Sequence, residues 1–130
     1  MSGRFIPPDH SRGDANTIGG YAAVHARPAA FEGSDGMSYS VEIVVDETGI
    51  VGRPFGAYFM FLRWRRVGTQ GIEGHLETDY LAYGATEDAA REAIGAMTLT
   101  AVKRLLDDLI GEQSAGRPTR RWWDAMRDDD

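Results

Sequence analysis

Four side chains that can bind protons or metal ions alternate along one short segment: Glu73, His75, Glu77 and Asp79. Alternate residues of a β-strand point to the same face, so a strand here would present all four side chains together. A histidine among carboxylates can hold a divalent metal ion or transfer protons. The same pattern is typical of a solvated strand face whose side chains form ion pairs with a neighbouring strand.

Two arginines bear on the choice between these interpretations. Arg63 and Arg65 occupy alternate positions of the preceding apolar segment, and a hairpin would bring them opposite Glu77 and His75. Positive charge at the same place disfavours a metal ion, so we expect neither a metal site nor a cofactor. We predict instead a charged face of ion pairs, formed by Arg63, Arg65, Glu73, His75, Glu77 and Asp79.

The run Arg63-Trp64-Arg65-Arg66 combines basic and aromatic residues, as surfaces that bind single-stranded nucleic acid do. In a strand, Trp64 would point away from Arg63 and Arg65, which separates the aromatic from the basic side chains. The whole chain carries a net charge of −6. An acidic domain lacks the electrostatic footprint of a nucleic-acid-binding protein, so we do not expect nucleic acid as a partner.

The C-terminal segment carries the clearest signal for a protein partner. Arginine, tryptophan and methionine are enriched at protein interfaces, and the segment concentrates all three types. The alternative is that the two tryptophans cover the core of their own domain. The predicted partner-binding residues of this segment are Arg120, Arg121, Trp122, Trp123 and Met126.

Alternating hydrophobic residues predict four β-strands in two hairpins. The strand at residues 39–46 is the clearest of the four, because its odd-numbered residues are apolar and its even-numbered ones mostly polar. Glycine-rich segments at 32–36 and 47–56 are predicted to be a turn and a loop. The strands are predicted at residues 21–30, 39–46, 57–67 and 72–83.

A three-residue loop, Thr69-Gln70-Gly71, would set the register of the second hairpin by pairing Gly68 with Ile72. Even-numbered residues of both strands would then form one apolar face, suited to packing against helices. The odd face would be charged near the turn and apolar farther away, where the N-terminal arm, the C-terminal tail or another subunit would cover it. This apolar zone gives four further predicted partner-binding residues: Phe59, Phe61, Leu81 and Tyr83.

Two helices are predicted after the strands. Thr86 is a helix cap followed by the acidic residues Glu87 and Asp88, which favour a helix start. The second helix presents an apolar stripe and is predicted to end at Gly111. That stripe contains Val102, Leu105, Leu106, Leu109 and Ile110.

These elements predict an α+β fold, a four-stranded antiparallel meander sheet with C-terminal helices packed on one face. Residues 21–113 would form this single domain, which suits a chain of 130 residues. Residues 1–20 would form an irregular N-terminal arm because they are rich in proline, glycine and polar residues. Residues 114–130 would form a C-terminal tail with a short helix.

The composition narrows the function classes further. The chain has no cysteine, which excludes disulfides, zinc–thiolate sites and a cysteine nucleophile. No apolar stretch has the length of a membrane-spanning helix or a signal peptide, so we expect a cytoplasmic protein without membrane contact. No nucleophile elbow, dinucleotide-binding motif or phosphate-binding loop is present.

The segment Gly84-Ala85-Thr86-Glu87-Asp88-Ala89-Ala90-Arg91-Glu92-Ala93 resembles the strand-to-helix junction of HicB-like antitoxin modules. In that family a glycine, a threonine cap and spaced alanines follow a small antiparallel sheet. The long hairpin at 57–83 departs from the compact family pattern. The resemblance implies binding to a protein partner; operator binding and functional residues are not carried over.

The sequence therefore favours a small acidic interaction or assembly module that binds a protein partner or forms a homo-oligomer, more than it favours an enzyme. Two alternatives stay open. One is a small metal-dependent or acid–base enzyme that uses the strand face of His75, Glu77 and Asp79. The other is an antitoxin-like regulator that binds a toxin.

Overall fold

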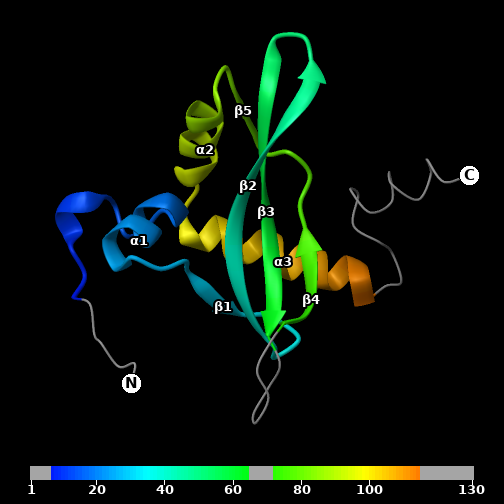
Figure 1. The fold of residues 1–130 in the computed structure, drawn as a ribbon. Coiled ribbons are helices and arrows are strands. Elements are labelled where there is room, and N and C mark those ends of the chain that lie inside the picture. The colour runs from blue at the N-terminus through cyan, green and yellow to red at the C-terminus, as the bar shows by residue number, and fades with distance from the viewer. Residues whose placement is uncertain (1–6, 65–71, 115–130) are drawn as a thin grey trace, which may run out of the picture.

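The computed structural model of the chain describes residues 7–64 and 72–114, and Figure 1 shows their arrangement. A long two-stranded hairpin forms the centre of a sheet, and the helices lie to one side of it. The elements in order are η1 (His10–Arg12), α1 (Ile18–His25), β1 (Ala30–Glu32), β2 (Ser38–Ile50), β3 (Arg53–Trp64), β4 (Ile72–Glu77), β5 (Ala82–Gly84), α2 (Glu87–Gly95) and α3 (Leu99–Ser114).

The sheet is antiparallel throughout and has the strand order β1-β2-β3-β4, with β5 also paired to β3. β2 occupies one edge of β3 along its whole length, so β4 and β5 follow each other along the opposite edge. The predicted α+β class and antiparallel sheet are confirmed, and two of the three α-helices are C-terminal.

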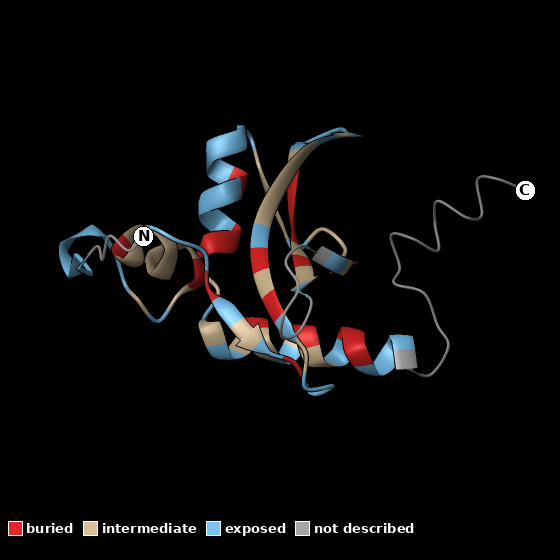
Figure 2. Ribbon diagram, turned by 60° about the horizontal axis from the view of Figure 1, so that its bottom comes forward, coloured by how far each residue is buried: buried red, intermediate tan, exposed pale blue. Residues whose placement is uncertain are grey.

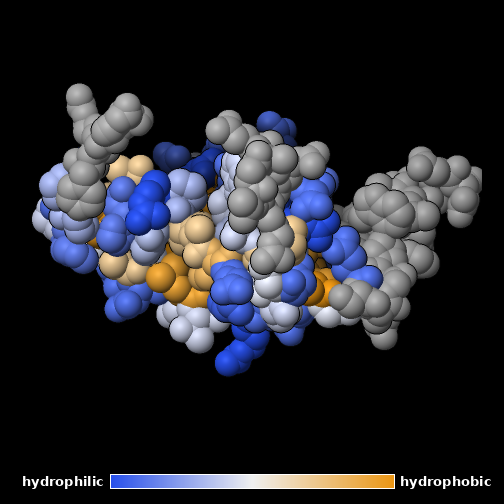
Figure 3. Space-filling model, turned by 90° about the horizontal axis from the view of Figure 1, so that it is seen from below, coloured by the Kyte–Doolittle hydropathy of each residue, from blue (hydrophilic) through white to orange (hydrophobic). Residues whose placement is uncertain are grey.

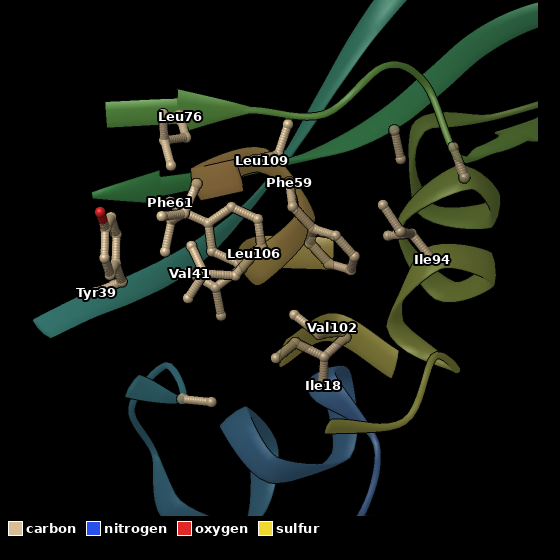
Figure 4. Close-up of a cluster of buried hydrophobic side chains, with 14 residues drawn as sticks. Ile18, Tyr39, Val41, Phe59, Phe61, Leu76, Ile94, Val102, Leu106 and Leu109 are labelled. Carbon is tan, nitrogen blue, oxygen red and sulfur yellow. The ribbon is translucent and has the colours of Figure 1, made fainter. Parts of the chain in front are cut away.

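The core lies between the sheet and the helices (Figures 2 and 4). Odd-numbered residues of β2 and β3 supply the sheet side, because Val41 pairs with Phe61 and Ile43 with Phe59. α2 and α3 supply the other side with an apolar stripe, as predicted for a helix that covers a sheet. The largest fully buried side chains are Tyr39, Phe59, Phe61, Ile94, Leu106, Val24 and Val102.

The predicted register of the second hairpin is wrong. Glu77 lies opposite Met60, not opposite Arg63, and Leu76 lies opposite Phe61. The pairing differs from the predicted one by an odd number of residues, so odd-numbered residues of β3 share a face with even-numbered residues of β4. The helices cover this odd face of β3 instead of the even one. β2 explains the outcome, because its apolar odd residues are in register with Phe59 and Phe61 and all of them must be buried together.

The predicted strand 72–83 is interrupted between β4 and β5. Thr78 is 5% exposed and bonds Phe59 twice: its N–H donates to the Phe59 carbonyl at 3.1 Å, and its Oγ1 accepts the Phe59 N–H at 3.1 Å. The same Oγ1 donates to the Asp79 carbonyl at 2.8 Å. The Tyr80 ring lies against Gly56, where an added Cβ would meet the Tyr80 Cδ1 at 2.7 Å. Both contacts show that the irregular connection is held firmly to β3.

The N-terminal region also differs from the prediction. A helix, α1, replaces most of the strand predicted at 21–30, and only β1 is extended. Thr17 caps this helix by accepting the Gly20 N–H at 3.0 Å, a local bond that alternation of apolar residues does not reveal. Ile18 belongs to the core and donates its N–H to the Met97 carbonyl at 2.8 Å. Residues predicted to be an irregular arm are therefore built into the fold.

The loop predicted at 47–56 is instead the continuation of β2 and β3 around a tight turn at Val51-Gly52. Gly52 has a φ of +83°, which glycine adopts without strain. The Thr86 cap of α2 is confirmed by its bond to the Ala89 N–H at 3.0 Å. α3 continues beyond the predicted end at Gly111 to Ser114.

Candidate protein-interaction surface

The sheet has an outer face, on the side away from α2 and α3. Strand pairing places the even-numbered residues of β2 and β3 on it, because the odd-numbered residues lie in the core. In Figure 1, β2 and β3 pass in front of α3, and no helix of the described residues covers this side. The outer face comprises Ser40, Glu42, Val44, Asp46, Tyr58, Met60, Leu62, Trp64, His75, Glu77 and Tyr83.

The middle of the outer face is apolar and partly exposed. Met60 and Leu62 are half-buried, and Trp64 is 37% exposed although it is a large aromatic residue. The Trp64 indole lies across the strands, because its Nε1–H donates to the Ser40 hydroxyl at 2.8 Å. A fixed indole loses little conformational entropy when a partner covers it.

One end of the outer face carries a cluster of tyrosines. Tyr80 packs edge-to-face on Tyr58, with ring centroids 5.9 Å apart, and lies equally close to Tyr83. The Tyr80 hydroxyl donates to the Asp46 carboxylate at 3.1 Å. Arg53 stacks over the Tyr83 ring at 4.9 Å. This end is rigid, and its aromatic rings are held in place by one another.

Among the described residues, carboxylates are the main charges of the outer face, and the Arg53 guanidinium on Tyr83 lies at one end of it. Glu42 and Asp46 extend from β2, and Glu77 extends from β4, with Met60 of β3 between Glu42 and Glu77. No lysine or arginine occupies an even-numbered position of β2 or β3. The face therefore combines apolar side chains with carboxylates, a composition that complements a basic surface.

The charged face predicted from the sequence is only partly assembled. The Arg63 Nε lies 4.0 Å from a Glu73 carboxylate oxygen, and the His75 Nε2 lies 3.7 Å from the Glu77 carboxylate. Arg63 lies opposite Gly74, on the side of the sheet opposite to His75 and Glu77. Within residues 7–64 and 72–114, no three acidic or histidine side chains gather closely enough to hold a metal ion. Arg65 lies outside the described residues, and Asp79 belongs to the connection after β4.

The predicted partner-binding residues fall into three groups. Phe59 and Phe61 are fully buried in the core of their own chain, so they present no surface to a partner, contrary to their prediction as partner-binding residues. Leu81 is 39% exposed, and Tyr83 is half-buried on the outer face. The residues predicted in the tail lie outside the described part of the chain, namely Arg120, Arg121, Trp122, Trp123 and Met126.

A groove that the sequence analysis missed lies on the other side of β2. It has a volume of about 900 Å³ and is bounded by α1, α2 and the edge of β2. Its floor forms where α1 and α2 meet, and a Cβ added to Gly19 would lie 3.1 Å from the Cα of Gly95. The only available signal was a glycine at position 19 and another at the distant position 95, and its meaning depends on recognising the helix α1 first.

The surface seen from below alternates between hydrophobic and hydrophilic patches (Figure 3). Among the described residues, no helix is both long enough and apolar enough to cross a membrane. Comparison with known proteins adds no relative: no family model, curated protein or solved structure matches the chain. The resemblance to HicB-like antitoxin modules therefore stays a prediction.

Proposed function

We propose that this protein is a non-enzymatic interaction module that binds the basic surface of a partner protein through the outer face of its sheet. The observation that carries the proposal is the composition of that face, which joins exposed apolar side chains to carboxylates. Aromatic and methionine side chains contribute a large share of the binding energy at protein interfaces. A sheet face of this kind is an apolar surface that a partner can cover.

Charge argues for a different chain as the partner. Two copies joined through their outer faces would bring Glu42, Asp46 and Glu77 of one copy towards the same carboxylates of the other. Like charges facing each other across an interface cost free energy and suppress the wrong pairing. A basic partner is attracted by the same carboxylates, and the net charge of −6 also speeds its approach.

A pair of lysine substitutions tests the proposal. Leu62→Lys places a positive charge in the apolar middle of the outer face, whereas Gln113→Lys makes the same change on an exposed position of α3. We expect Leu62→Lys to lose about 2 kcal/mol or more of binding free energy, because it disrupts an interface centre. Gln113→Lys is expected to bind like the wild type.

The measurement is quantitative co-purification of isotope-labelled variants from the cells that make the protein, followed by titration of the recovered partner. Both variants are first checked for an unchanged thermal midpoint, so that unfolding does not imitate lost binding. A specific partner retained equally by wild type and Leu62→Lys would contradict the proposed surface. Binding that does not weaken with added salt would contradict the proposed charge complementarity.

A further inference from the structure

β2 has a free edge along most of its length. β1 has only three residues and pairs with Ser38, Tyr39 and Ser40 of β2, while Val41 still donates its N–H to the Ala29 carbonyl at 3.2 Å. Backbone groups of alternate residues point to the same edge of a strand. The N–H and C=O groups of the odd-numbered residues beyond Val41 therefore point away from β3.

Three residues thus offer backbone hydrogen-bonding groups at this edge: Ile43, Val45 and Glu47. Among the described strands, none pairs with β2 at these residues on the side away from β3. The Ile43 carbonyl accepts a long bond from the Arg91 Nη1 at 3.4 Å. An open strand edge is a template for the addition of another extended chain.

The groove described above lies against the beginning of this edge. Val41, Glu42 and Ile43 form its β2 side, and the rest comes from η1, α1, residues 27–29 and α2. Its rim carries three arginines, Arg12, Arg27 and Arg91, beside the acidic Asp88 and Glu92 of α2. Figure 1 shows α1 on the side of the lower part of β2 from which β1 extends, below the point where β2 and β3 cross in this view. Small residues such as Ala22, Ala23 and Ala96 leave room for side chains. A strand added to β2 would therefore have the groove beside it.

The two sides of such a strand would meet different surroundings. Its alternate side chains on the helix side would enter the groove, next to Ile18 and Ala29. Those on the other side would lie beside Glu42 and Asp46 of the outer face. The first set is expected to be apolar and the second set basic.

A second copy of the chain fits this edge less well. Antiparallel pairing of β2 with its own copy around Val45 would place Ile43 opposite Glu47 and Val44 opposite Asp46. Carboxylates of both copies would then be concentrated along one short strand pair, where like charges are destabilising. The charge pattern favours a basic chain.

From these observations we infer a second binding site: the free edge of β2 takes an extended segment of another protein, in which apolar residues alternate with lysine or arginine. Backbone bonds to Ile43, Val45 and Glu47 would supply affinity, and the groove and carboxylates would supply specificity. The site shares Glu42 and Asp46 with the outer face but does not use its apolar middle around Leu62, so a substitution at Leu62 distinguishes the two.

Val45→Pro tests the inferred site. Proline removes the N–H that points to the free edge, while the β2–β3 ladder does not use that group, and edge positions tolerate proline. Val45→Ala is the matched control, since it also shortens the side chain but keeps the N–H. The probe is a displayed library of random nine-residue peptides, selected against the whole protein.

We expect the selected peptides to alternate apolar and basic residues and to bind Val45→Pro at least tenfold more weakly than Val45→Ala. Leu62→Lys should bind them like the wild type, which separates this result from failure of the outer face. If Val45→Pro does not fold, hydrogen exchange of the wild-type protein is measured instead. Bound peptide should then protect the amides of Ile43, Val45 and Glu47. The inference would be overturned if the selection enriches no peptides, or enriches peptides without this alternation. It would also be overturned if the peptides bind both Val45 variants equally, or leave the three amides unprotected.

Discussion

Tyr39 shows how one buried polar group ties the sheet to the turn before it. Its ring is fully buried in the core, and its hydroxyl donates to the Asp35 carboxylate at 2.7 Å. Burial raises the pKa of Tyr39 above its ordinary value, and the bond to Asp35 raises it further, while the nearby Arg63 guanidinium opposes both. The native state therefore holds this proton more tightly than the unfolded chain does.

This shift predicts a specific loss of stability in alkali. A raised pKa in the native state means that the unfolded chain releases the proton first, so the free energy of unfolding falls as the pH rises above about 10. Tyr39→Phe removes this contribution. We expect the variant to be less stable than wild type by about 1 kcal/mol at neutral pH, because it loses one hydrogen bond.

The difference between the two proteins should shrink as the pH rises above the ordinary tyrosine pKa. Urea unfolding at a series of pH values measures it, and the comparison cancels the titration of the other tyrosines. A constant difference between wild type and Tyr39→Phe across the alkaline range would show that Tyr39 does not titrate as inferred.

At the scale of elements, α1 depends on a close approach of two glycines. A Cβ on Gly19 would meet the Gly95 Cα and carbonyl oxygen, both at 3.1 Å, and backbone atoms cannot move aside cheaply. We expect Gly19→Ala to push α1 away from α2 and to lower the free energy of unfolding by about 1–3 kcal/mol, as overpacking does. Widening the α1–α2 contact would also alter the floor of the groove.

Gly111→Ala is the matched control. It lies within α3, and no atom stands within 4 Å of the position that its Cβ would occupy. Alanine is a better helix former than glycine, so the free energy of unfolding of this variant should rise by about 0.5–1 kcal/mol. Urea denaturation measures the free energy of unfolding of both variants. Equal changes in Gly19→Ala and Gly111→Ala would refute a tight α1–α2 contact.

The elements also show what the sequence was able to predict. β2, the Thr86 cap and the apolar stripe of α3 follow from local patterns, and the structure confirms them. α1 was missed because its alanines and glycines carry no helical periodicity, and its Thr17 cap matters only once the helix is assumed. Local alternation does not distinguish a short apolar helix from a strand.

The face of β3 was assigned wrongly for a related reason. Both faces of β3 hold apolar residues, so its own pattern does not say which one is buried. The prediction chose the buried face of β3 from the turn expected at 69–71. In the structure, the pairing of Phe59 and Phe61 with β2 determines which face is buried. Phe59 and Phe61 were thus assigned to the face away from the helices, whereas they lie in the core and Met60, Leu62 and Trp64 lie on that face.

At the scale of the whole molecule, the helices lie on one face of the sheet, and the carboxylates of Glu42, Asp46 and Glu77 lie on the other. α2 and α3 cover one face of a single sheet, and the described residues leave the other face and the edge of β2 beyond Val41 without a covering element. Our proposal of a basic protein partner rests on the apolar residues and carboxylates of the outer face, together with the net charge of −6. We propose that the predicted protein partner binds this surface.

Site-specific photo-crosslinking tests this central claim most directly, because the chain has no cysteine and a single introduced one can carry the label. Leu62→Cys places a benzophenone on the outer face, and Arg104→Cys places it on an exposed position of α3. In extracts of the cells that make the protein, we expect a discrete adduct with a basic protein from position 62, reduced by salt, and none from position 104. The same adducts from both positions, or none from position 62, would contradict the account.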